Sequence, residues 1–218
     1  MTNILVSDLH MGDGDSNDPF MSNKGSFLRF LNTVVMDNRL ILVGDVFDLW
    51  KTTLPKIINT HEGIVKEIIA KNSILILGNH DTDLYIFKKF FGDRIDYTIK
   101  VGEFTIMHGQ QLDYALDEKP ERVMARMASF LSGWAGPYIP FLSPIEKWLL
   151  KGHRINDNYI KKLLGEHPKG KYIIGHSHKP EIVDGWFYNC GSWGIDQTRL
   201  SYIEVNEEGT KAELKFFI

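Results

Sequence analysis

The sequence predicts a layered α/β fold in which a parallel central sheet is joined by a second sheet. In the first half of the chain, short apolar runs alternate with segments of helical spacing, and this β-α-β-α-β order is typical of parallel strands. The apolar runs are continuous rather than alternating, as in strands covered on both faces. The end of the chain is rich in strand-like runs, so we expect a second sheet packed on the first, with helices outside.

The first half contains three expected strands, at Asn3–Ser7, Leu40–Val43 and Ser73–Leu77. Two segments between them repeat apolar residues at the spacing of an amphipathic helix. The clearer stripe runs from Ile57 to Ile69, and the other from Phe27 to Val35. His61 lies on the first stripe, and we interpret it as a core histidine.

The second half begins with an expected hairpin, in which Ile95–Lys100 and Glu103–Met107 flank a Val-Gly turn. Later strands are expected at Lys171–Ile174, Trp186–Asn189, Leu200–Val205 and Ala212–Phe217, with a turn at Asn206–Gly209.

The stretch between these groups of strands, roughly Leu112–Gly165, has another character. Two runs of helical spacing flank an apolar patch broken by Pro and Gly, and Lys119 to Lys162 holds eight Lys or Arg against three Asp or Glu. We therefore expect one domain over residues 1–218 with an inserted helical cap over about 112–165. Apolar surface with basic flanks suits an amphiphilic phosphorylated ligand, although it could equally pack on the domain. The substrate-binding candidates in this cap are Arg122, Arg126 and Trp134.

Composition limits the class of protein. With 43% hydrophobic and 24% charged residues the chain can form a core, and its formal net charge of −3 favours neither nucleic acid nor an anionic membrane. No apolar run is long enough to cross a bilayer, and the first residues lack a secretory pattern. The single cysteine, Cys190, excludes an internal disulfide and is expected to be buried. We expect a cytoplasmic protein, with peripheral contact at the inner membrane face through the cap as an alternative.

Polar residues gather directly after the predicted strands, where α/β sheets bind their ligands. Five such loops supply carboxylates, imidazoles and one amide. This mixture suits Mn²⁺, Fe or Zn²⁺, and the lack of thiolates argues against a structural zinc site. Seven candidates exceed what one tetrahedral ion needs and suit two ions about 3.5 Å apart. The candidates are Asp8, His10, Asp45, Asn79, His108, His176 and His178. In an extended D-x-H segment, both side chains lie on the same side.

The ordered motifs D-x-H, G-D-x-x-D, G-N-H-D, H and G-H-x-H closely resemble those of the calcineurin-like metallophosphoesterase superfamily. The resemblance runs from Asp8 to His178 and continues to a turn at Asn189–Ser192. It implies a four-layer α-β-β-α sandwich and two divalent metal ions, with Mn²⁺ expected first and Fe, Zn²⁺, Ni²⁺ or Co²⁺ as alternatives. It also implies that one ion is held by Asp8, His10, Asp45 and His178, and the other by Asp45, Asn79, His108 and His176.

The same resemblance assigns catalytic roles. It implies that His80 lies beside the scissile phosphate and that Asp81 orients His80. From the chemistry of two such ions, we expect a bridging water to lose its proton near neutral pH and to attack phosphorus. Asp48 is expected only to brace its loop. Whether His80 stabilises charge or protonates the leaving oxygen stays open.

Within the superfamily, the segment GDVFDLW and the expected cap resemble the UDP-2,3-diacylglucosamine pyrophosphatase group, although HGQQLD departs from the acidic and hydroxyl residues typical there. We expect hydrolysis of a phosphodiester or pyrophosphate in a phosphorylated small molecule or lipid-like substrate, with a sugar-nucleotide lipid as one candidate. The alternatives are a nuclease or phosphomonoesterase of the same superfamily, or a metal-bound protein-binding scaffold. The complete ligand set with His80 argues against a scaffold, and the net charge argues against a nuclease.

The acidic loop Asp13–Asp18 resembles a calcium loop in composition but lacks the glutamate that closes such loops. We expect it to be solvated or to face the substrate.

Overall fold

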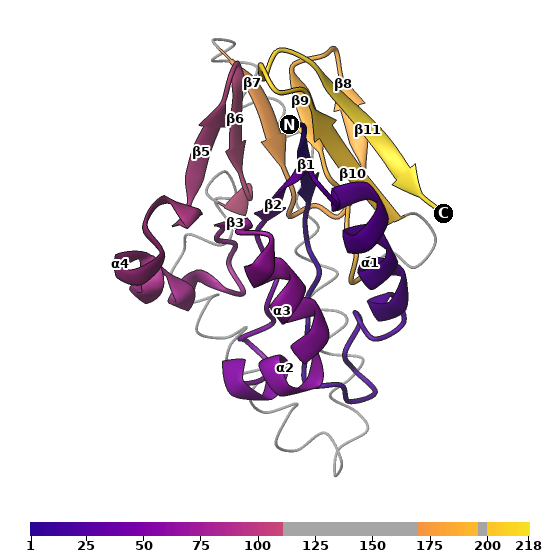
Figure 1. Ribbon diagram of the computed structural model, residues 1–218, viewed down its shortest axis with the longest axis vertical. Coiled ribbons are helices and arrows are strands. Elements are labelled where there is room, and N and C mark those ends of the chain that lie inside the picture. Colours follow the sequence, from indigo (N-terminus) through magenta and orange to yellow (C-terminus); the bar gives the residue numbers. More distant parts are fainter. Residues whose placement is uncertain (111–169, 196–199) are drawn as a thin grey trace. The chain divides into compact units, whose positions relative to one another are not determined.

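The computed structural model describes residues 1–110, 170–195 and 200–218 (Figure 1). The chain divides into two units, Met1–Gly109 with Pro168–Ile218, and Gln110–His167, and all the described helices and strands belong to the first. The expected cap at 112–165, with Arg122, Arg126 and Trp134, lies outside the described residues. None of the described helices is long and apolar enough to cross a membrane.

The first sheet has six strands in the order β11-β10-β1-β2-β3-β4. Neighbours from β1 to β4 are parallel, whereas β10 and β11 run antiparallel at the other edge. The strands are β1 (Asn3–Val6), β2 (Arg39–Val43), β3 (Ile74–Ile76), β4 (Ile95–Asp96), β10 (Leu200–Val205) and β11 (Ala212–Phe217). The predicted parallel βαβαβ arrangement is therefore present.

The second sheet has five strands in the order β5-β6-β7-β9-β8, with β6, β7 and β9 parallel. They are β5 (Thr98–Val101), β6 (Phe104–Met107), β7 (Lys171–Ile174), β8 (Glu181–Val183) and β9 (Phe187–Asn189). β8 was not predicted from the sequence. The predicted hairpin is confirmed only for β5 and β6, because Ile95–Asp96 pairs with β3 in the first sheet. The Asp96 carboxylate accepts a hydrogen bond from Tyr97 N (2.7 Å) where the chain passes between the sheets.

Two apolar cores follow from the alternation of side chains along β1 and β2. Ile4 and Val6 of β1 pack with helical residues such as Phe27, whereas Leu5 packs with residues of the second sheet such as Phe104. The first sheet is therefore covered by helices on one face and by the second sheet on the other (Figure 1). This two-sheet α/β arrangement agrees with the predicted fold class. The second outer helical layer that the resemblance implies is not formed by the part of the chain described here.

The helices differ from the prediction at one point. The stripe from Ile57 to Ile69 forms two helices, because His61 has non-helical backbone angles (φ −112°, ψ 26°), ending one helix and beginning the next. The side chain of His61 is buried as predicted, and its Nε2 lies 3.0 Å from Asp18 Oδ2. The elements are α1 (Lys24–Phe30), running into a π-helical turn at Leu31–Val35, then α2 (Leu54–Thr60), α3 (Glu62–Ala70) and α4 (Lys88–Phe91), the last flanked by 3₁₀ turns at Thr82–Phe87 and Gly92–Arg94.

Candidate metal centre

The carboxyl ends of five parallel strands bring the seven predicted ligand residues to one edge of the two sheets. Backbone hydrogen bonds tie these loops together. Asp8 N donates to Gly44 O (3.1 Å), His10 N to Asp45 O (2.9 Å), and Gly175 N to His108 O (3.0 Å). Residues far apart in sequence are thus held in one cluster by main-chain geometry.

The backbone at this edge is unusual. The φ angles of five of the seven residues lie between 49° and 68°, a left-handed region that side chains other than glycine enter at a cost of about 1–3 kcal/mol. These residues are Asp8, His10, Asp45, His176 and His178. The sequence suggested an extended D-x-H segment, but Asp8 and His10 both have left-handed backbone. Their two side chains therefore converge through strained turns. Strain of this kind persists where the surrounding structure enforces a particular side-chain direction.

Three ligand atoms form a first set. Asp8 Oδ1 lies 3.6 Å from His10 Nε2 and 3.1 Å from His178 Nε2, and the two imidazole nitrogens lie 3.3 Å apart. Metal–ligand bonds of about 2.1 Å place neighbouring ligand atoms roughly 3.0–3.4 Å apart around an ion. The spacing of this set therefore fits a divalent cation at its centre.

A second set is formed by Asp45, His108 and His176, whose potential ligand atoms lie within 4.8 Å of one another. Asp45 Oδ2 lies 3.2 Å from His108 Nε2 of this set and 4.0 Å from His10 Nε2 of the first. Asp45 therefore stands between the two sets, where a bridging carboxylate would be placed.

Several buried polar atoms of the cluster lack hydrogen bonds. Asp8 Oδ1, Asn79 Oδ1 and His108 Nε2 are buried and form none with any residue that the structure describes. His108 Nδ1 lies 2.7 Å from Val43 O, so it carries a proton that it donates to this carbonyl, and its Nε2 is left for another partner. Buried polar atoms without partners are costly, and two ions would satisfy them, one at Asp8 Oδ1 and the other at Asn79 Oδ1 and His108 Nε2.

The carboxylates and imidazoles of the cluster shift one another's pKa values. Burial alone would raise the pKa of Asp8, but the neighbouring His178 and His108 hold it well below its usual value. Burial alone would also raise the pKa of Asp45, but the charges of His108 and His80 hold it well below its usual value. Burial would lower the pKa of His108, but the carboxylates of Asp45 and Asp8 raise it to about 10. The pocket thus favours two ionised carboxylates together with compensating positive charge.

Glycines leave room for this arrangement. A Cβ atom added at Gly44, Gly78 or Gly175 would lie within 3 Å of a ligand side chain, namely His108, Asp45 and Asp8 in turn. Gly44 also has a φ of 81°, which favours glycine. The small residues before the ligands are therefore required by close packing of the ligands themselves.

His80 lies beside the cluster, and its surroundings differ from the expectation. His80 Nδ1 lies 2.9 Å from Asp48 Oδ1, and Lys51 Nζ lies 3.1 Å from the other Asp48 oxygen. Asp81, which the resemblance assigned to orienting His80, instead accepts hydrogen bonds from the backbone N–H groups of Gly78 and Val46, both at 2.7 Å. The prediction is therefore corrected, because Asp48 contacts the imidazole and Asp81 ties two loops together.

The pKa values of the two acids shift in opposite directions. Burial and the charge of Asp45 raise the pKa of Asp81 to about 6. Burial would raise the pKa of Asp48, but its hydrogen bond with His80 and the charge of that ring hold it well below normal.

Supporting residues near Asp8 were only partly visible in the sequence. The Ser7 hydroxyl contacts the Asp8 carboxylate and donates to Val43 O (2.7 Å), and Ser192 Oγ donates to Asp8 O (2.9 Å). Asn189 Nδ2 donates to Gly175 O (2.9 Å). The predicted turn at Asn189–Ser192 thus supports two of the ligand loops, whereas no sequence signal distinguished Ser7. Cys190 within this turn is buried as predicted, and burial raises the pKa of its thiol.

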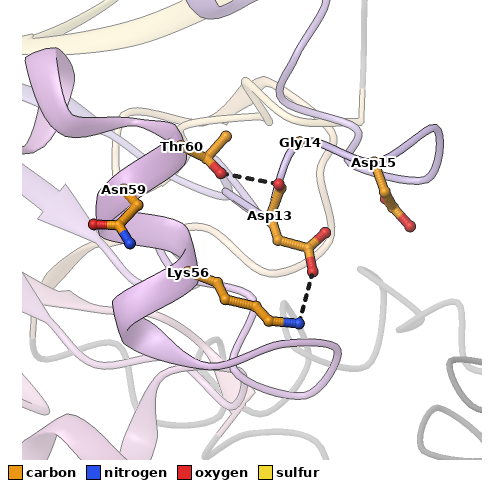
Figure 2. Close-up of a pocket in the computed structure, with 6 residues that line it drawn as sticks. All are labelled: Asp13, Gly14, Asp15, Lys56, Asn59 and Thr60. Carbon is orange, nitrogen blue, oxygen red and sulfur yellow. Dashed lines mark hydrogen bonds and ion pairs between the residues drawn. The ribbon is translucent and has the colours of Figure 1, made fainter.

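The acidic loop contributes to a surface pocket. A surface pocket of about 480 Å³ is lined by Asp13 and Asp15 of the loop and by Lys56 and Thr60 of α2 (Figure 2). Thr60 Oγ1 donates to Asp13 O (2.9 Å), and Lys56 Nζ lies 4.0 Å from the Asp13 carboxylate. The loop was expected to be solvated or to face the substrate, and Asp18 does not follow this expectation, because it is buried against His61.

Most of the chain matches a known protein family. The family model for calcineurin-like phosphoesterases matches residues 1–189. None of the curated proteins matches the chain.

Solved structures resemble the fold. A dimetal phosphatase from Danio rerio is 10% identical, with a TM-score of 0.51, over 99% of this chain and 95% of that one. A novel archaeal phosphodiesterase is 16% identical, with a TM-score of 0.48, over 99% of each chain. Vacuolar Protein Sorting 29 from Cryptosporidium parvum is 14% identical, with a TM-score of 0.44, over 99% of this chain and 97% of that one. At these identities, the Danio rerio structure supports the two-sheet fold and nothing finer.

Proposed function

The chain belongs to the calcineurin-like phosphoesterase family, and on that premise we propose that it hydrolyses phosphodiester or pyrophosphate bonds at a centre of two divalent metal ions. The observation that carries the proposal is the convergence of six of the seven ligand candidates in two groups, five of them held by left-handed backbone. Metal-dependent phosphoester hydrolysis is the activity of this family, and the bond type is our own inference.

The residues divide into two sets that share one carboxylate. Asp8, His10, Asp45 and His178 would hold one ion, and Asp45, Asn79, His108 and His176 the other. The central position of Asp45 Oδ2 between His108 and His10 supports this division. We place Mn²⁺ first among the metals, with Fe, Zn²⁺, Ni²⁺ and Co²⁺ suited to the same nitrogen and oxygen donors.

Two such ions supply Lewis acidity, which activates water and neutralises the charge on phosphoryl oxygens. The chain's own contribution is His80. Its Nδ1 is held by Asp48, while its Nε2 lies 3.9 Å from Asp45 Oδ2 and so faces the space where a phosphate would bind. Burial would lower the pKa of His80, but the charge of Asp45 and the hydrogen bond and charge of Asp48 raise it above its ordinary value. A protonated Nε2 can donate to a phosphoryl oxygen or to the leaving oxygen.

The candidate substrates are phosphorylated small molecules or lipid-like molecules, including a sugar-nucleotide lipid similar to UDP-2,3-diacylglucosamine. Support for the lipid comes from the segment Gly44–Trp50 and from the basic, apolar composition between Lys119 and Lys162.

The test uses the full chain, stripped of metal with a chelator and reloaded with Mn²⁺. We expect it to cleave a bis-aryl phosphodiester, and a panel with an aryl phosphomonoester and a sugar-nucleotide lipid then defines the substrate class. Asp45→Ala is the inactive control. If the loaded protein cleaved none of these and behaved like Asp45→Ala, the enzyme function would be wrong and a metal-bound scaffold would replace it. Steep salt dependence of DNA binding would instead favour a nuclease.

A further inference from the structure

The turn that follows Asp48 places an aromatic ring on His80. The Trp50 indole stacks on the His80 imidazole with ring centroids 4.0 Å apart and planes inclined by 20°. Asp48, Trp50 and Lys51 all come from this turn, in which Lys51 N donates to Asp48 O (3.2 Å). His80 comes from the separate loop after β3, so the contact joins two loops.

His80 is bounded on several sides. Asp48 holds its Nδ1 at 2.9 Å, Trp50 covers one ring face, and the His10 ring meets it edge-on at 4.7 Å. The backbone N–H of His80 also donates to Asp45 Oδ1 (2.9 Å). A hydrogen bond to Nδ1 fixes one point of the ring but leaves rotation about that contact possible. A stacked indole fixes the remaining variable, the plane of the ring.

Core packing among the residues that the structure describes does not account for Trp50. Among the described residues, it belongs to neither apolar cluster, although its neighbour Leu49 packs against the first. Its Nε1 atom is buried and forms no hydrogen bond within the described part of the chain. A buried N–H without a partner is unfavourable, and an indole placed only for stability would normally satisfy it.

Resting on the proposed function, we propose that Trp50 is a positioning residue for His80: its indole face fixes the imidazole plane so that Nε2 faces the phosphate-binding space beside Asp45. Trp50 thus acts on the reaction through His80 and not by touching the substrate.

The first measurement compares Trp50→Ala and Trp50→Phe with the wild type on an activated bis-aryl phosphodiester with Mn²⁺. We expect Trp50→Ala to lower kcat by about 10- to 100-fold, because a catalytic group loses its alignment. KM and bound metal should remain near the wild-type values. Trp50→Phe retains a stacking face and should recover most of kcat. Trp186→Ala is the matched control, because this half-buried tryptophan packs on Phe187 away from the cluster and its loss should leave kcat unchanged.

The second measurement asks whether Trp50 acts through His80. In a His80→Asn background, Trp50→Ala should cause no further loss of kcat. A separate readout without turnover is the NMR spectrum of the His80 ring protons, which the indole ring current shifts in the wild type and in Trp50→Phe but not in Trp50→Ala.

The results separate the two ideas. An active wild type whose kcat is unchanged by Trp50→Ala would overturn the positioning role. So would a loss that persists in the His80→Asn background, or a change confined to KM, since either would mean that Trp50 contacts the substrate or supports the fold. A wild type that hydrolyses nothing would overturn the proposed function, and the catalytic role of Trp50 with it, even if the NMR shift showed the stack.

Discussion

Two regions of the molecule hold buried contacts between aspartate and histidine, and they differ in kind. In the candidate metal cluster, two carboxylates and several imidazoles converge through left-handed backbone, and some of their buried atoms form no hydrogen bond with the residues that the structure describes. In the other region, Asp18 and His61 form a single pair with fully buried side chains.

The pair of Asp18 and His61 is almost completely satisfied. Asp18 accepts hydrogen bonds from Gly14 N (3.0 Å) and Phe20 N (3.1 Å) in addition to the contact with His61. Of the polar atoms in these two side chains, only His61 Nδ1 has no hydrogen bond with a described residue. When His61 Nε2 donates to Asp18, Nδ1 has no proton to donate and carries only a lone pair. His61 has an ordinary negative φ, −112°.

The difference shows which features identify a reactive site. A buried carboxylate beside an imidazole is compatible with a purely structural role, as Asp18 demonstrates by tying the acidic loop to the start of α3. The candidate metal cluster is distinguished by strained backbone together with buried ligand atoms, such as Asp8 Oδ1 and His108 Nε2, that form no hydrogen bond with the described residues. Strain is retained where it supports function, at a cost to stability.

The largest expected effect separates the two regions by activity. Asp45→Asn should lower kcat for the diester by about 10³-fold or more, since the loss of metal-based charge stabilisation is worth several kcal/mol. Metal content measured by mass spectrometry should fall below two ions per chain. Asp18→Asn is the counterpart and should retain both metal and kcat. A normal metal content in the Asp45→Asn protein would contradict the role of Asp45 as a metal ligand.

A second prediction distinguishes the two acids near His80. Asp48→Asn should lower kcat by about 10- to 100-fold with little change in metal content, because outer partners of a catalytic centre typically contribute this much. Asp81→Asn should mainly lower the melting temperature, because Asp81 accepts backbone hydrogen bonds from two loops. Measuring kcat and the melting temperature of both variants decides the matter. If Asp81→Asn lowered kcat and Asp48→Asn mainly lowered the melting temperature, Asp81 would be the residue that orients His80.

A third prediction concerns stability. Asp18→Asn should lower the free energy of unfolding by about 1–3 kcal/mol, because a hydrogen-bonded buried charge is lost. Burial would raise the pKa of Asp18, but its hydrogen bonds with His61 and Gly12 hold it below the ordinary value of 3.8. A carboxylate with a lowered folded pKa stabilises the protein above its unfolded pKa, about 3.9, and this contribution is lost as pH falls through the folded value.

The stability difference between wild type and Asp18→Asn should therefore be constant from about pH 5 to 8 and shrink on acidification below about pH 4. Urea unfolding at several pH values measures it. A difference that grew on acidification would contradict the assignment.

The smallest effect compares two glycines. A Cβ atom added at Gly63 in α3 would meet nothing within 4 Å, so Gly63→Ala should raise the free energy of unfolding by about 0.4–1 kcal/mol. The same change at Gly78 brings a methyl group against Asp45 and should lower metal content as well as stability. Thermal melts and metal analysis of both variants test this contrast, and a Gly78→Ala protein that binds metal normally would argue against close packing of Asp45 on Gly78.

Most of the secondary structure could be predicted from local patterns. β10 and β11 lie where their residue types placed them, and β1 to β3 differ by one or two residues at their ends. The errors have a common origin in contacts between distant segments. At the helix break, the side chain of His61 contacts Asp18, which lies 43 residues away in sequence, and Ile95 and Asp96 join the first sheet by pairing with β3. Local spacing contains neither contact.

The sequence by itself determined the chemistry of this protein, because carboxylates, imidazoles and an amide placed after strand ends must meet where parallel strands end together. Only the tertiary structure decided how these groups are supported. Asp48 and Asp81 are both acids near His80, and the relative placement of two loops selects Asp48 for the imidazole and Asp81 for the backbone. The stack of Trp50 on His80 has the same cause, since a contact between two loops depends on their arrangement in space and has no counterpart in the spacing of residues along the chain.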